Sequence, residues 1–170
     1  GTPVLFEGRL YVPVASLEEP ESGQADYACC TFRGYLSALD AATGREIWKT
    51  YTIPEAPKVV GKNSRGKDML APAGAGIWAT PTIDLKRRAL YFGTGNNFSD
   101  PPTKTSDAVM ALDMDTGKVL WVVQEYEGDV WHTGCQSVRY GTPPVQPGRG
   151  GPPGRGQAAR PADYYCPDVQ

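Results

Sequence analysis

Two glycine-rich segments have the spacing of nucleotide-binding motifs, and each fails on a neighbouring residue. Residues 61–67 match the spacing of a phosphate-binding loop, but Asp68 stands where that loop requires Ser or Thr. Residues 74–79 match G-x-G-x-x-A, but Pro81 prevents the helix whose N-terminus would bind a pyrophosphate. Phosphate-binding and dinucleotide-binding chemistry are therefore not expected.

The four cysteines can carry redox or structural chemistry. Cys29 and Cys30 are adjacent, which excludes a C-x-x-C metal pair and the C-x-x-C-H attachment of haem. A vicinal disulfide and a pair of reduced thiols both stay open. Cys135 and Cys166 flank a Gly/Pro-rich segment, and a disulfide between them would stabilise the fold by about 3–4 kcal/mol in the chain-entropy model, with reduced thiols as the alternative. Disulfides would indicate an oxidising compartment.

Composition narrows the class of protein. The 170 residues include 20 Gly and 16 Pro, which disfavours long helices, while 40% hydrophobic residues suffice for a core. The net charge of −2 favours neither nucleic acid nor an anionic membrane as a partner. No segment has the roughly 18–20 apolar residues of a membrane helix, so we expect no membrane span. Because the chain begins at Gly1 without a leader, we expect a processed protein or a piece of a longer one.

An internal repeat gives the strongest structural signal. Residues 38–48 and 111–121 both read A-x-D-x-x-T-G-x-x-x-W, and Leu-Tyr-Val at 10–12 recurs as Leu-Tyr-Phe at 90–92. Repeats of this size indicate a stacked or radial architecture. In each turn Asp40 or Asp113 can accept backbone N–H bonds. The Trp that ends each repeat can offer a flat face to a neighbouring sheet.

Around each repeat the pattern predicts four strands. The first set covers 2–6, 9–14, 35–39 and 45–51, and the second covers 80–84, 89–93, 109–113 and 118–123. Four-stranded antiparallel sheets joined radially make an all-β propeller, which needs about four to eight blades, so we expect a partial propeller with an incomplete ring. Long insertions are expected at 16–32, 52–76 and 94–106. We assign residues 1–132 to the blades and 133–170 to a Gly/Pro-rich loop or tail.

The repeat resembles the tryptophan-docking motif of pyrroloquinoline-quinone (PQQ) dehydrogenases. Residues 93–96, G-T-G-N, resemble the metal-ligand segment of that family, and Trp78 stands 18 residues earlier than Asn96, close to the family's spacing. Residues 74–78 (GAGIW) and 29–34 (CCTFRG) further resemble the polyvinyl-alcohol dehydrogenase branch. The resemblance implies an eight-bladed propeller that uses PQQ and Ca²⁺ to oxidise alcohols in the periplasm.

The resemblance also implies a metal site of one Glu and one Asn. Ca²⁺ prefers several hard oxygen ligands, which suits this pair. Asn96 is the candidate amide, and Ser16-Leu17-Glu18-Glu19 resembles the family's S-x-x-E, which favours Glu19 with Glu18 as the alternative. Solvated loop acids are the simpler interpretation.

For the cofactor, the resemblance implies an aromatic floor, and Trp78 is the candidate for it. A flat tricyclic quinone is positioned by stacking, which a Trp at this position can supply, whereas core packing is the alternative interpretation. Cys29, Cys30 and Ser16 are further cofactor-binding candidates by resemblance.

The catalytic base departs from the family pattern. Related alcohol dehydrogenases use the Asp of a Trp-Asp pair, but here His132 follows Trp131. Asp129 can serve instead, or His132, the only His in the chain, can act as a base near neutral pH. A loop His bonded to backbone groups is the alternative.

Two functions follow from this sequence. The first is a portion of a PQQ-dependent dehydrogenase that oxidises alcohol groups, polyvinyl alcohol or others, by hydride transfer to PQQ. It would pass electrons to an acceptor such as a cytochrome c, in the periplasm or outside the cell. We expect the chain on its own to be inactive, because two blades cannot enclose a cofactor. The second is a non-catalytic repeat propeller that binds proteins as a scaffold in the cell envelope.

Overall fold

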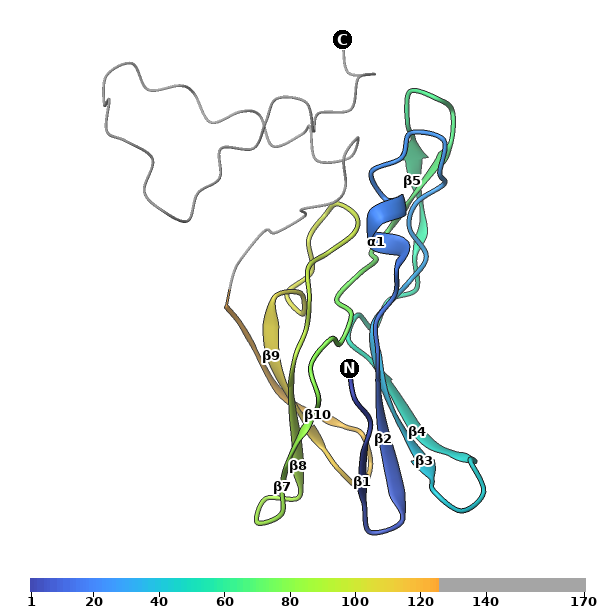
Figure 1. Cartoon of the computed structure of the whole chain (residues 1–170). Coiled ribbons are helices and arrows are strands. Elements are labelled where there is room, and N and C mark those ends of the chain that lie inside the picture. Colours follow the sequence, from blue (N-terminus) through green and yellow to red (C-terminus); the bar gives the residue numbers. More distant parts are fainter. Residues whose placement is uncertain (126–170) are drawn as a thin grey trace, which may run out of the picture.

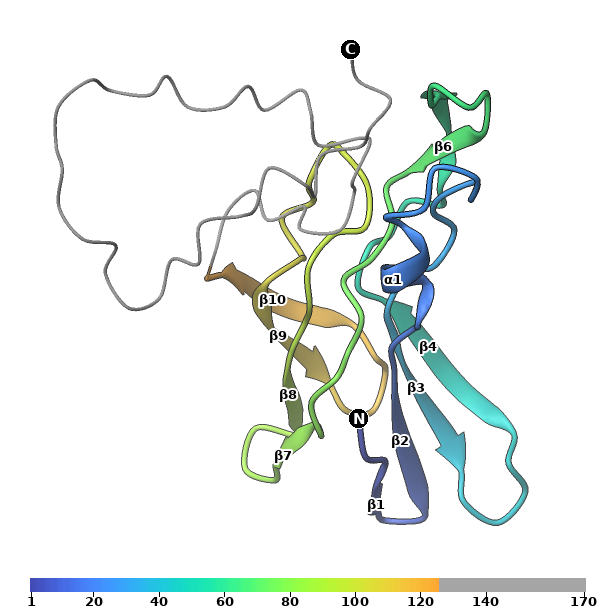
Figure 2. The ribbon, with the colours of Figure 1, turned by 45° about the horizontal axis from the view of Figure 1, so that its top comes forward.

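The structure, a computed structural model, describes residues 1–125 of the chain and consists almost entirely of antiparallel strands (Figures 1 and 2). Two four-stranded sheets and one two-stranded sheet account for the strands. The first sheet has the order β1 (Val4–Phe6), β2 (Arg9–Val14), β3 (Tyr35–Asp40) and β4 (Glu46–Tyr51). The second has the order β7 (Thr82–Asp84), β8 (Ala89–Gly93), β9 (Ala108–Asp113) and β10 (Val119–Gln124).

The two four-stranded sheets are the predicted blades, and their strand bounds differ from the predicted ones by no more than two residues. Both repeats form the same turn. The Oδ1 atom of Asp40 accepts the Thr43 N–H at 2.8 Å and the Thr43 hydroxyl at 2.7 Å, and Asp113 makes the same two bonds to Thr116. These bonds hold the pKa of both carboxyls below the usual range. The all-β, incomplete propeller predicted from the sequence is confirmed.

Trp48 packs the first blade against the second. Its indole lies over Gly117, where an added Cβ would come within 2.6 Å of Trp48 Cδ2. The Thr50 hydroxyl donates to the Gly117 carbonyl at 2.6 Å. Within its own sheet Trp48 packs at 5.9 Å from Tyr11, between ring centroids. The predicted docking role of the repeat Trp is therefore confirmed at this interface.

The main core lies between the two blades. It contains side chains from the inner strands of both sheets, Met114 directly after β9, and Ile77 from the chain that connects the sheets. Its buried members are Tyr11, Leu36, Ala38, Ile77, Leu90, Phe92, Met110, Leu112 and Met114.

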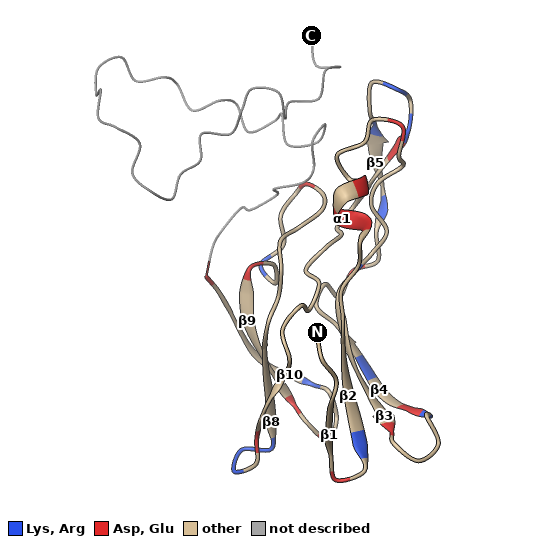
Figure 3. Cartoon of the chain, in the orientation of Figure 1, with Lys and Arg blue, Asp and Glu red and all other residues tan. Residues whose placement is uncertain are grey.

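Ion pairs join the two blades near their turns, where charged positions of both signs lie (Figure 3). Asp115 of the second blade bonds to Arg9 of the first at 2.8 Å and to Arg88 at 2.7 Å. Arg88 also reaches Glu7 at 3.2 Å. The Arg88 hydrogen bond, followed by the charges of Arg88 and Arg9, lowers the pKa of Asp115 to about 2.

The predicted insertions contain regular structure that the sequence did not indicate. The helix α1 (Glu18–Glu21) lies in insertion 16–32, and the hairpin of β5 (Lys58–Lys62) and β6 (Asp68–Ala71) lies in insertion 52–76. No helix in residues 1–125 has the length and apolar character needed to cross a membrane. The predicted 133–170 tail, and with it the boundary at residue 132, lies outside the described residues.

Gly117→Ala tests the docking of Trp48. Gly44 has the same turn conformation, with φ of 73° against 72°, but nothing lies within 4 Å of its Cβ position. Gly44→Ala should therefore lose only the conformational cost, about 1 kcal/mol of the free energy of unfolding. Gly117→Ala should lose about 2–3 kcal/mol more, because its methyl group displaces the indole. Denaturant unfolding measures both, and equal losses would contradict the docking.

Asp115→Asn tests the charged network. Because the folded pKa of Asp115 is about 2, below its ordinary value of 3.8, its contribution to stability is present above about pH 4 and is lost as the pH falls toward 2. The side chain is 35% exposed, so we expect a loss of about 1 kcal/mol or less at neutral pH. The difference from the parent should disappear near pH 2, and the exposed Glu55→Gln should show no such profile. Urea unfolding across this pH range measures it, and a pH-independent difference would contradict the ion-pair account.

Candidate functional site

The centre of the candidate site is residues 74–78, here called the connecting segment, which runs between the two blades. Its backbone bonds to segments from both blades, so it fixes their ends relative to each other. The bonds are Gly74 N to Phe32 O at 2.8 Å, Ala75 N to Asn96 O at 2.8 Å, Gly95 N to Gly76 O at 2.8 Å, and Ile77 N to Val14 O at 3.0 Å.

Small residues are required where this segment passes between its neighbours. Gly74 has φ of +113°, and an added Cβ would lie 2.6 Å from the Asn96 carbonyl oxygen. A Cβ on Gly34 would overlap the carbonyl oxygen of Ala75. Larger side chains at Gly74 or Gly34 would therefore push the connecting segment away from the blades.

Trp78 ends the connecting segment with an exposed indole. Its side chain is 48% exposed, unlike that of a core tryptophan. One edge rests on Gly95, where an added Cβ would be 3.2 Å from Trp78 Cδ1 and from Nε1. The glycine therefore lets the indole lie against the backbone that precedes Asn96, and much of the ring stays open for a flat ligand.

Cys29 and Cys30 form a disulfide, so of the two alternatives left by the sequence the bridged one is present. Both residues are almost fully buried. The Cys29 segment runs alongside β6, with Leu70 N donating to Cys29 O at 2.5 Å and Cys30 N to Leu70 O at 3.3 Å. The hairpin thus supports the disulfide. A second apolar cluster surrounds it, made of Cys29, Cys30, Ala73 and Phe98 with Tyr27 and Phe32 packed against them.

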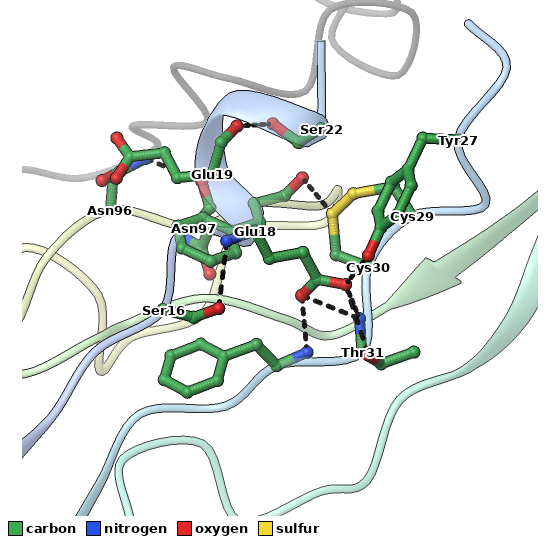
Figure 4. The surroundings of a disulfide bond; sticks show 12 residues. Ser16, Glu18, Glu19, Ser22, Tyr27, Cys29, Cys30, Thr31, Asn96 and Asn97 are labelled. Carbon is green, nitrogen blue, oxygen red and sulfur yellow. Dashed lines mark hydrogen bonds between the residues drawn. A yellow bond between two sulfur atoms is a disulfide. The ribbon is translucent and has the colours of Figure 1, made fainter. Parts of the chain in front are cut away.

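The two acids of α1 face different surroundings. Glu18 is 8% exposed, and its carboxylate accepts the Phe32 N–H at 2.7 Å and the Thr31 N–H at 2.9 Å. The Glu19 side chain leaves the helix on the other side, toward Asn96 (Figure 4). The carboxylate of Glu18, the alternative metal ligand, is therefore engaged by backbone donors. The predicted cofactor residue Ser16 accepts the Glu18 N–H on its hydroxyl at 3.0 Å.

A buried amide holds the loop that carries Asn96. Asn97 is fully buried, and its Oδ1 accepts the Thr103 N–H at 3.1 Å while its Nδ2 donates to the Ser106 hydroxyl at 2.5 Å. Asn96 donates its Nδ2 to the Asn97 carbonyl at 3.1 Å. This donation turns its side-chain oxygen away from Asn97 and makes that oxygen the atom suited to a cation.

The helix α1 and the segment that carries the disulfide lie toward the end of the first blade opposite the β3–β4 turn (Figure 1). Trp78 and the loop of Asn96 meet at Gly95, and α1 lies beside the disulfide. Residues 1–125 hold no group of three or more His, Cys, Asp or Glu that would bind a metal by itself. The predicted bases Asp129 and His132, and the cysteines Cys135 and Cys166, lie outside the described residues.

Residues 2–137 match the model of the PQQ glucose/ethanol/alcohol dehydrogenase β-propeller domain. The chain belongs to this family. A polyvinylalcohol dehydrogenase from Sphingopyxis sp. (strain 113P3) is 44% identical over 135 residues, which cover 79% of this chain and 21% of that protein. The crystal structure of a quinohemoprotein alcohol dehydrogenase from Comamonas testosteroni is similar with a TM-score of 0.54 and 25% identity, over 76% of this chain and 21% of that one. A europium-containing methanol dehydrogenase shares the fold, with a TM-score of 0.52 and 19% identity over 78% of this chain and 25% of that one.

The coverages also show how much of its relatives this chain represents. It spans about a fifth of the length of the polyvinylalcohol dehydrogenase that it matches. Among the described residues it supplies two blades, which agrees with the incomplete ring seen in the structure.

Asn97→Ala tests how the Asn96 loop is held. Removal of the buried amide leaves the Thr103 N–H and the Ser106 hydroxyl without this partner, so we expect a loss of about 2–3 kcal/mol of the free energy of unfolding. Asn63 offers a matched control, because its Oδ1 also accepts two hydrogen bonds, here from the N–H groups of Arg65 and Lys67, and its Nδ2 also donates one, to the Ala25 carbonyl, but in less buried surroundings. Asn63→Ala should lose less than about 1 kcal/mol. Denaturant unfolding compares them, and the reverse order would contradict this account.

Proposed function

We propose that this chain is a portion of a PQQ-dependent dehydrogenase that oxidises alcohol groups, with a polyvinyl-alcohol-like substrate as the first candidate. The observation that carries the proposal is that an exposed indole rests against Gly95, the residue before Asn96, and that the Glu19 side chain extends toward Asn96 (Figure 4), in a chain of this family. The 44% identical polyvinylalcohol dehydrogenase supports the substrate class.

Trp78 is proposed as the floor on which the cofactor stacks. Bound PQQ would supply the two-electron acceptor for the oxidation. The role of the protein is to fix the orientation of the cofactor ring. Trp78 suits this role because its indole rests on Gly95 along one edge and is 48% exposed. The Cys29–Cys30 disulfide is proposed as a second contact surface of the cofactor.

Glu19 and Asn96 are proposed as ligands of Ca²⁺. Both offer hard oxygen atoms, and their side chains lie on the same side of α1 (Figure 4). Calcium takes about six to eight oxygen ligands, so these two residues would supply only part of its shell. This agrees with the absence of a complete metal cluster in residues 1–125.

The proton acceptor, the electron acceptor and the compartment are further parts of the proposal. Asp129 or His132 would take the hydroxyl proton of the substrate. The names of the quinohemoprotein relatives support a cytochrome-type acceptor for the electrons. The Cys29–Cys30 disulfide supports a periplasmic or secreted location, because disulfides persist in oxidising compartments.

Titration of the chain with PQQ in the presence and absence of Ca²⁺, followed by Trp fluorescence, tests the proposal. We expect saturable, calcium-dependent quenching in the parent. Trp78→Ala should weaken the affinity for PQQ about tenfold or more, because the stacking of the quinone ring on the indole is lost. Trp121→Ala is the matched control, because Trp121 is 43% exposed but belongs to the repeat on β10.

For the metal, Glu19→Gln should remove the calcium dependence, and Glu21→Gln in the same helix should leave it unchanged. Equal losses with Trp78→Ala and Trp121→Ala would contradict the assigned floor. No quenching by PQQ, with or without Ca²⁺, in a protein that carries the complete ring would contradict the cofactor site and favour the protein-binding scaffold.

A further inference from the structure

A buried carboxylate joins the two sides of the candidate site. Glu18 is 8% exposed, yet five hydrogen bonds from three residues reach its two oxygens (Figure 4). Thr31 donates from its N–H and its hydroxyl, Phe32 from its N–H, and Tyr27 from its phenol. Backbone N–H bonds to a carboxylate are charge-assisted, and together they offset the cost of burying the charge.

These donors belong to the segment that carries the disulfide. Thr31 and Phe32 follow Cys30 directly, and Tyr27 and Phe32 pack on the apolar cluster around the disulfide. Glu18 therefore binds this segment immediately after the two cysteines.

On the other side, Glu18 belongs to α1, one residue before Glu19. A helix of four residues is too short to be stable alone, so contacts outside it must fix its position. The carbonyl oxygens of Glu18 and Glu19 both accept the Ser22 N–H, at 3.0 and 3.2 Å. The backbones of Glu18 and Glu19 are thus held by the same hydrogen-bond donor.

We propose that Glu18 is a positioning residue: its carboxylate clamps the disulfide segment to α1, so that the Cys29–Cys30 disulfide and the Glu19 carboxylate keep a fixed relative position. The significance of Glu19 rests on the proposed function, whereas the clamp itself rests on the hydrogen bonds of Glu18. Glu18 contacts neither cofactor nor metal in this account and acts through its neighbours.

Amide hydrogen exchange of the full chain tests the clamp without any cofactor. The Thr31 and Phe32 amides donate to Glu18, so their protection reports the clamp directly. Glu18→Gln keeps the length of the side chain but exchanges one accepting oxygen for a donor. We expect exchange at both amides to rise about tenfold or more, since hydrogen bonds to a charged group are lost. Exchange at Ser22 should rise with them, while the core amides of Leu36 and Ala38 should not change.

Two further variants sharpen the test. Glu21→Gln is the matched control, because Glu21 lies in the same helix and its carboxylate accepts an exposed bond from Gln24. It should leave the Thr31 and Phe32 amides unchanged. Glu18→Asp keeps the charge but shortens the reach, so it should also raise their exchange, and it serves if Glu18→Gln fails to fold.

Calcium binding to the same variants tests the consequence for Glu19. Glu18→Gln should raise the calcium dissociation constant about tenfold, and Glu21→Gln should change it less than about twofold. Unchanged exchange at Thr31 and Phe32 would overturn the clamp, and raised exchange there with no change at Ser22 would overturn the coupling to α1. A parent that binds no calcium would instead contradict the metal site of the proposed function, and the exchange rates would still decide the clamp.

Discussion

The passage of the connecting segment between the two blades is the constraint on which the rest of the site depends. Its peptide groups bond to the end of β2, to the loop before β3 and to the loop after β8, so three segments distant in sequence share one backbone scaffold. Close approach is possible because Gly74 and Gly34 carry no side chain where the backbones meet. Trp78 and Asn96 take their places from this scaffold, since each is directly attached to one of the bonded peptides.

The opposite end of the blades is held by different forces. Trp48 stacks on Gly117 and Asp115 pairs with two arginines, which combines apolar contact with charge at one interface. The core lies between these two ends and includes Ile77 of the connecting segment. Because the docking contacts of the repeat lie at the other end, the end of the blades that carries the disulfide is free of them. The candidate cofactor and metal residues lie at this end.

The repeat made the blades predictable from sequence, because the residues that shape its turns have definite structural reasons for their types. Asp40 and Asp113 cap their own turns, and Gly117 needs both its positive φ and its bare surface under Trp48. The hairpin β5–β6 had no such signal, since β5 lacks an apolar alternation: Val59 and Val60 are consecutive and both exposed.

The site was predictable only in part, because its decisive contacts are not local. Trp78 and Asn96 were predicted from a spacing shared with a family. The choice between Glu18 and Glu19 as the metal ligand depends instead on hydrogen-bond donors that lie more than ten residues along the chain. Asn97, which holds the Asn96 loop, depends on Thr103 and Ser106, partners that lie six and nine residues along the chain. The adjacent cysteines allowed both a disulfide and free thiols, and only the fold distinguishes them.

The central claim is that the connecting segment presents Trp78 and Asn96 to one redox cofactor. A crystal structure of the protein grown with PQQ and Ca²⁺ tests it most directly. The account predicts the cofactor ring in van der Waals contact with the open face of Trp78, and calcium bound by oxygens of Glu19 and Asn96. Cofactor bound away from Trp78, or calcium bound without either residue, would contradict it.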